Sequence, residues 1–230
     1  MKNTEDKITE DKVIEQMFEA GAHFGYSRAK RHSSAKRVLF GSKNGTDIFD
    51  LEKTKKYLEE AKEFVKSLSE QKKQILFVGG KNEARKIVEE TAVALGLPFV
   101  ASRWIGGTLT NFTEIRKRVQ KLERLRQEKE KGEWGKYTKK EALDLSKELE
   151  KLEKTFSGLV EMKSLPTALF VVDAKHEDIA VTEAKSMNIP VVSLSNSDND
   201  ISKIDYPIPA NDTSKTSIEY FVKQIEEAYK

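Results

Sequence analysis

The side chains best suited to acid–base chemistry lie in one short run, Asp173-Ala174-Lys175-His176-Glu177-Asp178, which follows an apolar stretch ending at Val172. A carboxylate, an amine and an imidazole there could transfer protons. Their position also fits an active site, because α/β enzymes place their sites at the carboxyl ends of strands. Acidic residues also stabilise the first turn of a helix through its dipole. Since no other residues complete a mechanism, we interpret Glu177 and Asp178 as helix-start residues.

A second candidate is the pair Gly79-Gly80, which separates an apolar run from a helix expected to start near Asn82. Amides at a helix N-terminus can hold a phosphate, but the sequence contains neither the dinucleotide-binding fingerprint nor a P-loop. A flavodoxin-like enzyme that binds a nucleotide or sugar phosphate between Gly79-Gly80 and Asp173 therefore stays an alternative hypothesis.

Metal and serine-nucleophile chemistry have no support in the sequence. The three histidines have no metal-ligand spacing, cysteine is absent, and no Gly-x-Ser-x-Gly motif occurs. We therefore expect no metal, no cofactor and no catalytic residue.

The charges of the chain are strongly segregated, although they nearly balance overall. The 230 residues include 41 Lys and Arg against 38 Asp and Glu, a formal net charge of +3. Residues 28–43 hold six cations and no acid, residues 101–126 hold seven cations and two acids, and residues 173–212 hold three lysines and eight acids. This segregation predicts a polyanion on the basic side, and solvent or basic neighbours on the acidic side.

Two segments add aromatic residues and glycines to basic side chains, a mixture that suits RNA. Residues 20–28 interleave aromatics with glycines just before the first basic stretch, and residues 103–112 precede the basic run at 116–121. Rings can stack on unpaired bases while Arg and Lys pair with phosphates. Phe24 and Tyr26 could equally anchor their segment on the core.

In the second segment we expect Trp104 to be buried, and the amides of the Gly106-Gly107-Thr108 turn to be free beside Arg103. The predicted RNA-binding residues are His23, Phe24, Gly25, Tyr26, Arg28, Lys30, Arg31, Lys36, Arg37, Arg103, Gly106, Gly107, Thr108, Asn111, Lys117 and Arg118.

The elements that must position these residues alternate between strand and helix. Continuous apolar runs predict buried strands, and helical spacing between them predicts βαβ units with a parallel sheet. The expected strands are 75–78, 98–100, 169–172 and 190–194, with an edge strand at 206–208 and a terminal helix from about 214 to 229. Before the sheet we expect a helix at 14–20, a hairpin turning at Asn44-Gly45 and a helix capped by Asp50.

Between residues 112 and 156 the alternation gives way to heptad spacing. Apolar residues step by three and four from Phe112 to Leu122 and again from Leu145 to Leu159, on helices otherwise rich in Lys and Glu. This pattern predicts an antiparallel coiled-coil hairpin. We therefore expect one α/β domain formed by residues 1–111 and 157–230, with residues 112–156 as an inserted hairpin.

A series of motifs identifies a family that the chain resembles nearly end to end. They are Glu19–Gly25, Phe40–Gly45, Ile48–Thr54, Ile75–Lys81, Arg103–Phe112, Leu165–Asp173 and Asp205–Pro209. In these motifs and in their order the chain resembles the bacterial form of the small-subunit ribosomal protein S-two family.

The resemblance implies a flavodoxin-like, three-layer α/β fold with a parallel sheet and an inserted antiparallel coiled-coil hairpin. It also implies a non-catalytic constituent of the small (30S) ribosomal subunit, bound to 16S ribosomal RNA between the head and the body. The implied partners are 16S rRNA and neighbouring small-subunit proteins, including the mRNA-binding protein S-one, which the protein would help to dock.

Further features favour a cytoplasmic, ribosome-bound protein without a membrane partner. The absence of cysteine fits a reducing compartment. The longest apolar run, Ala168 to Val172, is far shorter than a membrane span. The charged N-terminus does not resemble a secretory signal.

Some positions depart from the family's usual pattern. Tyr26 stands where a second His is usual, Arg31–Lys36 replaces Trp-Asn-Pro-Lys-Met, and Ala174 follows Asp173 in place of Pro. Ser195–Asp198 replaces a turn that contains Asp-Thr-Asn. We interpret these departures as marks of a divergent lineage rather than of a different function.

Overall fold

A parallel sheet of five strands forms the centre of the molecule. The computed structural model describes residues 4–230, with the side chains from residue 12 onward. In chain order the strands are β4 (Ile75–Val78), β5 (Phe99–Val100), β6 (Ala168–Val172), β7 (Val191–Ser195) and β8 (Tyr206–Pro209). Their spatial order is β5-β4-β6-β7-β8. This is the flavodoxin-like order, in which the strand order reverses between the parallel neighbours β4 and β6.

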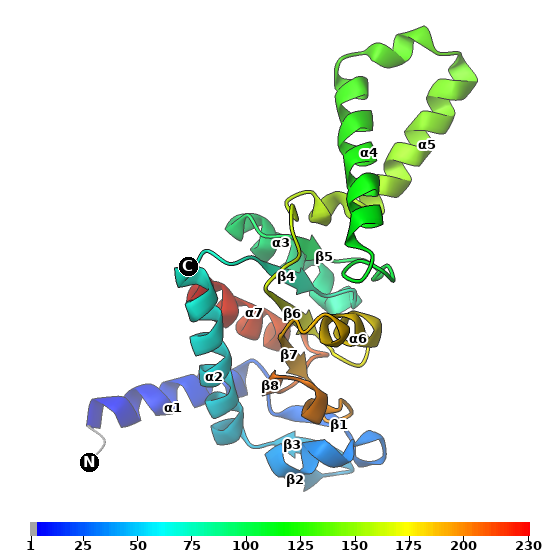
Figure 1. The fold of residues 1–230 in the computed structure, drawn as a ribbon. Coiled ribbons are helices and arrows are strands. Elements are labelled where there is room, and N and C mark those ends of the chain that lie inside the picture. The colour runs from blue at the N-terminus through cyan, green and yellow to red at the C-terminus, as the bar shows by residue number, and fades with distance from the viewer. Residues whose placement is uncertain (1–3) are drawn as a thin grey trace.

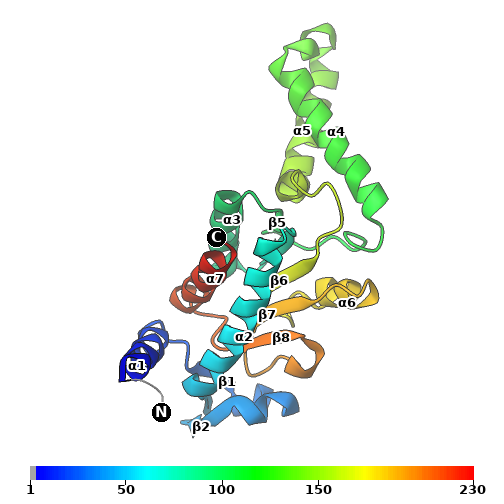
Figure 2. The same ribbon diagram turned by 60° about the vertical axis from the view of Figure 1, so that its left-hand side comes forward.

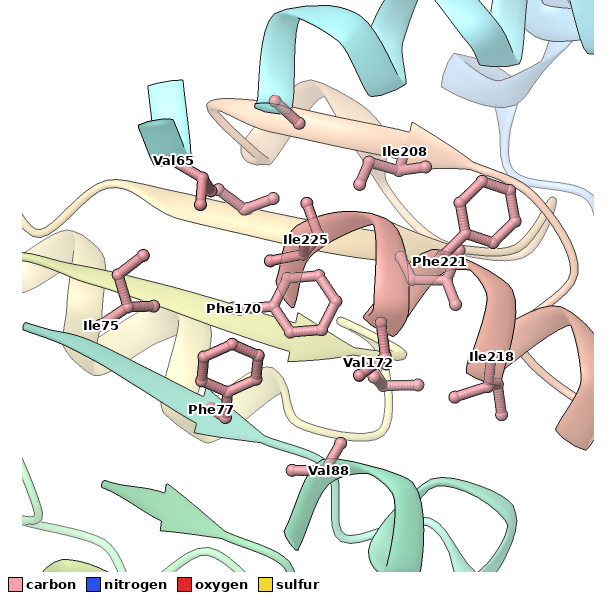
Figure 3. Close-up of a cluster of buried hydrophobic side chains, with 14 of the residues drawn as sticks. Val65, Ile75, Phe77, Val88, Phe170, Val172, Ile208, Ile218, Phe221 and Ile225 are labelled. Carbon is pink, nitrogen blue, oxygen red and sulfur yellow. The ribbon is translucent and has the colours of Figure 1, made fainter. Parts of the chain in front are cut away.

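Helices cover both faces of the sheet because alternate strand residues point to opposite sides. Ile75, Phe77 and Phe170 face one side, where the rings of Phe77 and Phe170 pack 5.3 Å apart. The covering helices there are α2 (Leu51–Glu70), α3 (Asn82–Leu95) and α7 (Lys215–Tyr229). Figure 3 shows this apolar layer between the helices and the sheet.

The opposite face carries the base of a long helical arm. Leu76 and Val78 of β4 point there, together with Trp104 and Leu109 of the loop that follows β5. Helix α6 (Asp178–Ser186) completes the cover. The predicted α/β fold with a parallel sheet is thus confirmed, and all five predicted strands are present within one or two residues.

The arm consists of α4 (Phe112–Glu130), a short turn η3 (Glu133–Lys136) and α5 (Lys139–Phe156), and it projects away from the sheet (Figure 1). Val119, Leu122 and Leu125 of α4 share an apolar cluster with Leu149 and Leu152 of α5. The two predicted helices are therefore present and packed together. Their supercoiling as a coiled coil stays a prediction.

The N-terminal part adds a smaller antiparallel sheet in the order β1-β3-β2. The predicted hairpin is confirmed: β2 (Leu39–Lys43) and β3 (Thr46–Phe49) flank Asn44 and Gly45, which both have positive φ. Strand β1 (Phe24–Ser27) was not predicted, because it is short and contains a glycine. The first helix, α1 (Thr4–Glu19), begins before the predicted Ile14.

Short 3-10 helices make up several of the connections. They are η1 (Arg28–Lys30), η2 (Ser33–Val38), η4 (Ser157–Leu159) and η5 (Ile201–Lys203). The η1 and η2 helices carry most of the first basic stretch, and η4 joins the arm to β6.

The contact between η4 and β5 leaves no room for a side chain at Gly158. A Cβ at this position would collide with the carbonyl oxygen of Phe99. We expect Gly158→Ala to lower the free energy of unfolding by about 1–3 kcal/mol, because the root of the arm would have to shift. Gly135→Ala in the arm tip is the control, since a Cβ there meets no atom within 4 Å. Urea unfolding of the two variants tests this, and equal stabilities would contradict it.

Candidate nucleic-acid interface

Both basic segments lie at the carboxyl edge of the parallel sheet. The arm-root segment, residues 101–111, directly follows β5. The N-terminal segment reaches the same edge through the loop after β7: the Tyr26 amide donates to Ser197 Oγ (3.0 Å) and the His32 amide to the Ser197 carbonyl (2.8 Å). In Figures 1 and 2 both segments lie on the same side of the molecule as α6.

Most of the N-terminal cations point into solvent. Arg28, Lys30, Lys36 and Arg37 are all exposed. The Lys30 ammonium lies 5.2 Å from the centre of the Tyr26 ring, a cation–π geometry. These four side chains are available to phosphates, and we name them the N-terminal basic cluster.

Arg31 lies among the basic cluster but is engaged inside the protein. Its Nε donates to Asp47 Oδ2 at 2.7 Å, and its second terminal nitrogen donates to Asp47 Oδ1 and to Ser42 Oγ. The Asp47 side chain is fully buried, so this forked ion pair compensates a charge that water cannot reach. The hydrogen bond from Arg31 holds the pKa of Asp47 below its ordinary value, although burial opposes it.

The predicted aromatic segment forms a ring stack on the surface. His23 stacks on Phe18 with ring centres 4.4 Å apart and contacts Phe24 at 4.0 Å. Phe18 and Phe24 are 60% and 49% exposed, far more than ordinary core rings. Burial lowers the pKa of His23, which favours its neutral form. Phe18 was not predicted as a site residue, because it lies on α1, outside the motif.

The neighbouring predicted residues Gly25 and Tyr26 have structural contacts. A Cβ on Gly25 would lie 3.1 Å from both Asp47 Cβ and Ser197 Oγ, so this glycine allows β1 to lie close to β3 and to the loop after β7. Tyr26 is half-buried, and its amide hydrogen bonds fix β1 on the loop after β7.

A buried carboxylate organises the arm-root segment. Glu183 of α6 is 8% exposed and accepts hydrogen bonds from the amides of Gly107 (2.7 Å), Leu109 (3.0 Å) and Thr110 (3.2 Å). The Thr110 hydroxyl and the Trp104 indole also donate to it. Burial alone would raise the pKa of Glu183, but these hydrogen bonds outweigh it and lower the pKa.

The expectation of free amides in this segment is therefore wrong at two positions. The Gly107 amide is bound by Glu183, and the Thr108 amide donates to the Ile105 carbonyl at 3.1 Å. Thr108 itself is buried, whereas Gly106 and Asn111 are exposed. Sequence reasoning could not find Glu183, because its partners lie more than 70 residues away.

The cations around the arm root differ in whether they pair with an acidic side chain. Arg103 is exposed in the loop after β5, and Arg118 is exposed on the first turns of α4. Lys117 is also exposed, but its ammonium lies 2.6 Å from Glu114. Arg103 and Arg118 form the arm-root basic cluster.

Only half of the acids in the acidic stretch lie at the surface as expected. Asp173, Glu177, Glu183 and Asp212 are all buried, at 8%, 3%, 8% and 0% exposure. Others in this stretch pair on the surface, as Asp198 does with Lys175 (2.9 Å). The acids turn inward because they accept hydrogen bonds from amides and cations of the protein itself.

The chain matches the model of a known protein family. The family model described as ribosomal protein S2 matches residues 17–230, which is nearly the whole chain. The chain belongs to the ribosomal protein S2 family. This is a family of structural proteins of the small ribosomal subunit and not a family of enzymes.

The place assigned to a nucleotide under the alternative hypothesis is occupied by the chain's own side chains. The Lys81 ammonium lies 3.1 Å from Asp173 and 3.2 Å from Asp212. Burial, and then the charge of Asp173, raise the pKa of Asp212 to about 6. A Cβ on Gly80 would lie 2.7 Å from Glu177 Oε1, which accepts the Gly80 amide. A ligand phosphate would meet carboxylates here.

Among the side chains that the structure describes, those of residues 12–230, no group of three or more His, Cys, Asp or Glu is placed to hold a metal ion. Over the same range, every helix is too short or too polar to cross a membrane.

Loss of Arg31 should destabilise the protein, unlike loss of the exposed cations near it. Arg31→Ala leaves the Asp47 carboxylate buried and unpaired, which costs about 3–5 kcal/mol. Arg37→Ala, on an exposed neighbour, should change the free energy of unfolding by less than about 0.5 kcal/mol. Chemical denaturation measures both values. Equal effects of the two variants would show that the Arg31–Asp47 pair has no structural importance.

Glu183→Gln should weaken the root of the arm in a pH-dependent way. The charge-assisted hydrogen bonds that it removes are worth about 2 kcal/mol to stability. Because the folded protein lowers the pKa of Glu183, the wild-type advantage is complete above the ordinary carboxyl pKa. It disappears as the pH falls through the lowered value. Urea unfolding at neutral and acidic pH tests this, with the exposed Glu150→Gln as control. A pH-independent difference would contradict it.

Proposed function

We propose that this protein binds 16S rRNA through the N-terminal and arm-root basic clusters as a structural constituent of the small ribosomal subunit. The observation that carries the proposal is the division of charge at the carboxyl edge of the sheet. Arg28, Lys36, Arg37 and Arg103 are exposed there, while four acids of the same edge and of α6 are buried. A ligand that approaches this edge therefore meets mainly cations, which is the condition for binding a polyanion.

The two clusters lie on rigid supports, which suits a structural contact. The N-terminal cluster is held by the Arg31–Asp47 pair and by the hydrogen bonds to Ser197. The arm-root cluster is held by Glu183. Phosphate contacts made by such a framework fix the position of the protein on folded RNA and carry no sequence information themselves.

The remaining expectations complete the proposal. Residues 1–111 and 157–230 form the α/β domain, and residues 112–156 are a coiled-coil hairpin inserted into it. The protein works in the cytoplasm on the ribosome, where it helps neighbouring small-subunit proteins, including the mRNA-binding protein S-one, to dock. The exposed Phe18–His23–Phe24 stack is compatible with either an unpaired base or a protein side chain.

The dependence of binding on salt tests the electrostatic part of the proposal. If six phosphates are engaged, the logarithm of the 16S rRNA affinity should fall against the logarithm of salt with a slope of roughly −4 to −5. A variant with Arg28, Lys36 and Arg37 replaced by Ala should reduce this slope by roughly 2 to 3 units, because three phosphate contacts are lost. Filter binding measures the affinities. An affinity that does not change with ionic strength would overturn the proposal.

Association with the ribosome provides the second test. Wild-type protein should sediment with the small subunit in a cell lysate and leave it at high salt. The triple variant should be depleted from the subunit while its circular dichroism and unfolding midpoint match the wild type. Lys86 and Lys223, exposed on α3 and α7, supply the control, since their replacement by Gln removes cations elsewhere. If that control variant is depleted equally, net charge rather than the basic clusters governs association.

A further inference from the structure

A pocket of about 360 Å³ opens at the carboxyl edge of the sheet, beside the point where the strand order reverses. Its walls come from three places: the turn after β4 and the start of α3, the loop after β5, and the turn between β6 and α6. Ligands of doubly wound α/β folds bind at such reversal points, and the volume falls within the ~300–1,000 Å³ of small-ligand pockets. The pocket lies outside both basic clusters except for Arg103, which it shares with the arm root.

Two guanidinium groups converge on the pocket from different elements. Arg85 of α3 donates from Nε to the Gly80 carbonyl at 2.8 Å, which fixes the base of its side chain. Arg103 enters from the loop after β5. Both residues are exposed, so their terminal nitrogens are open to a ligand from outside. Guanidinium groups are well suited to phosphate, because their fork of donors matches its oxygens.

The floor of the pocket is closed by the carboxylate of Glu177, which already has hydrogen-bond partners within the protein. Glu177 is 3% exposed, and its Oε1 accepts the Gly80 amide at 3.0 Å and lies 2.8 Å from Nδ1 of His176. The Gly80 amide, in the turn before α3, is thus unavailable to a ligand. A phosphate has to bind at the rim, between Arg85 and Arg103, and not in the depth where α/β enzymes hold it.

One wall of the pocket is apolar although it faces solvent. Ile179 at the start of α6 is 54% exposed, and the buried Trp104 also lines the pocket. An exposed isoleucine in a pocket with two cations provides an apolar contact for a base whose phosphate the cations hold. A free inorganic ion would use only the cations and would leave this wall in water.

We propose that this pocket receives one unpaired nucleotide of 16S rRNA, with its phosphate between Arg85 and Arg103 and its base against Ile179. The inference rests on the proposed function, since it requires RNA at the carboxyl edge, and it adds the kind of RNA element that is recognised there. An unpaired nucleotide offers both an apolar base face and a phosphate, which suits a pocket that combines an apolar wall with cations.

Three variants separate this pocket from the basic clusters. The pocket variant combines Arg85→Gln with Arg103→Gln, and the wall variant, Ile179→Glu, places a carboxylate against the base. The matched control, Lys86→Gln with Lys223→Gln, removes the same number of charges from exposed positions on α3 and α7. The probes are 16S rRNA, a short oligouridylate and uridine monophosphate. Unfolding midpoints are measured first to establish that all variants fold.

We expect the pocket variant and the wall variant each to weaken oligouridylate binding about tenfold, and the control less than about twofold. The pocket variant should also reduce the salt slope by roughly 1. Ultraviolet crosslinking of the wild type to oligouridylate should label the peptide that contains Trp104, and the pocket variant should lose this label.

The contrary outcomes point to different errors. If wild-type protein binds no RNA, both the proposed function and this inference fail. If the Arg28, Lys36 and Arg37 variant loses rRNA binding but the pocket variant and the wall variant match the control, the function stands and the pocket assignment is wrong. If uridine monophosphate binds the pocket as tightly as oligouridylate does, the ligand is a free nucleotide, and the assignment to rRNA is overturned.

Discussion

Five donors from one loop converge on the buried carboxylate of Glu183, and the placement of the arm depends on that convergence. The loop leaves the sheet at β5, crosses the end of α6 and then starts α4. Without an acceptor, the Leu109 amide and the Trp104 indole would be buried without partners, which a folded protein rarely tolerates. Through Glu183, helix α6 is therefore hydrogen-bonded to the loop that connects the sheet to the root of the arm.

The pairing of buried carboxylates with donors of the protein also explains the electrostatics of the molecule. A formal charge of +3 suggests a nearly neutral surface, but a count along the chain does not distinguish buried from exposed charge. Asp47, Glu177, Glu183 and Asp212 all lie inside, where each accepts hydrogen bonds from the protein. Because these negative charges are paired internally, they offset the exposed cations less. The electrostatic potential at the carboxyl edge is therefore more positive than the composition indicates.

The sequence predicted the fold well because strand and helix signals are local. The buried strands are continuous apolar runs, and the hairpin at Asn44-Gly45 has a turn that few other residues can form. The short strand β1 was missed because contacts with the distant Ser197 stabilise it. For the same reason the interface was predicted only in part. Basic residues are visible in a sequence, but Arg31 and Arg37 look alike there, and only the buried Asp47 distinguishes the first from the second.

The sheet also shows how a fold suited to ligands can be used for assembly. At the reversal point of a flavodoxin-like sheet, amides and helix dipoles commonly attract a phosphate group. Here Glu177 takes the Gly80 amide, while Lys81 forms ion pairs with Asp173 and Asp212, so the deep position is filled by charges of the chain itself. What stays accessible is the rim, where Arg85 and Arg103 are anchored on α3 and on the arm root. A rim of cations around a filled centre is suited to hold the backbone of a large polyanion that lies across the edge.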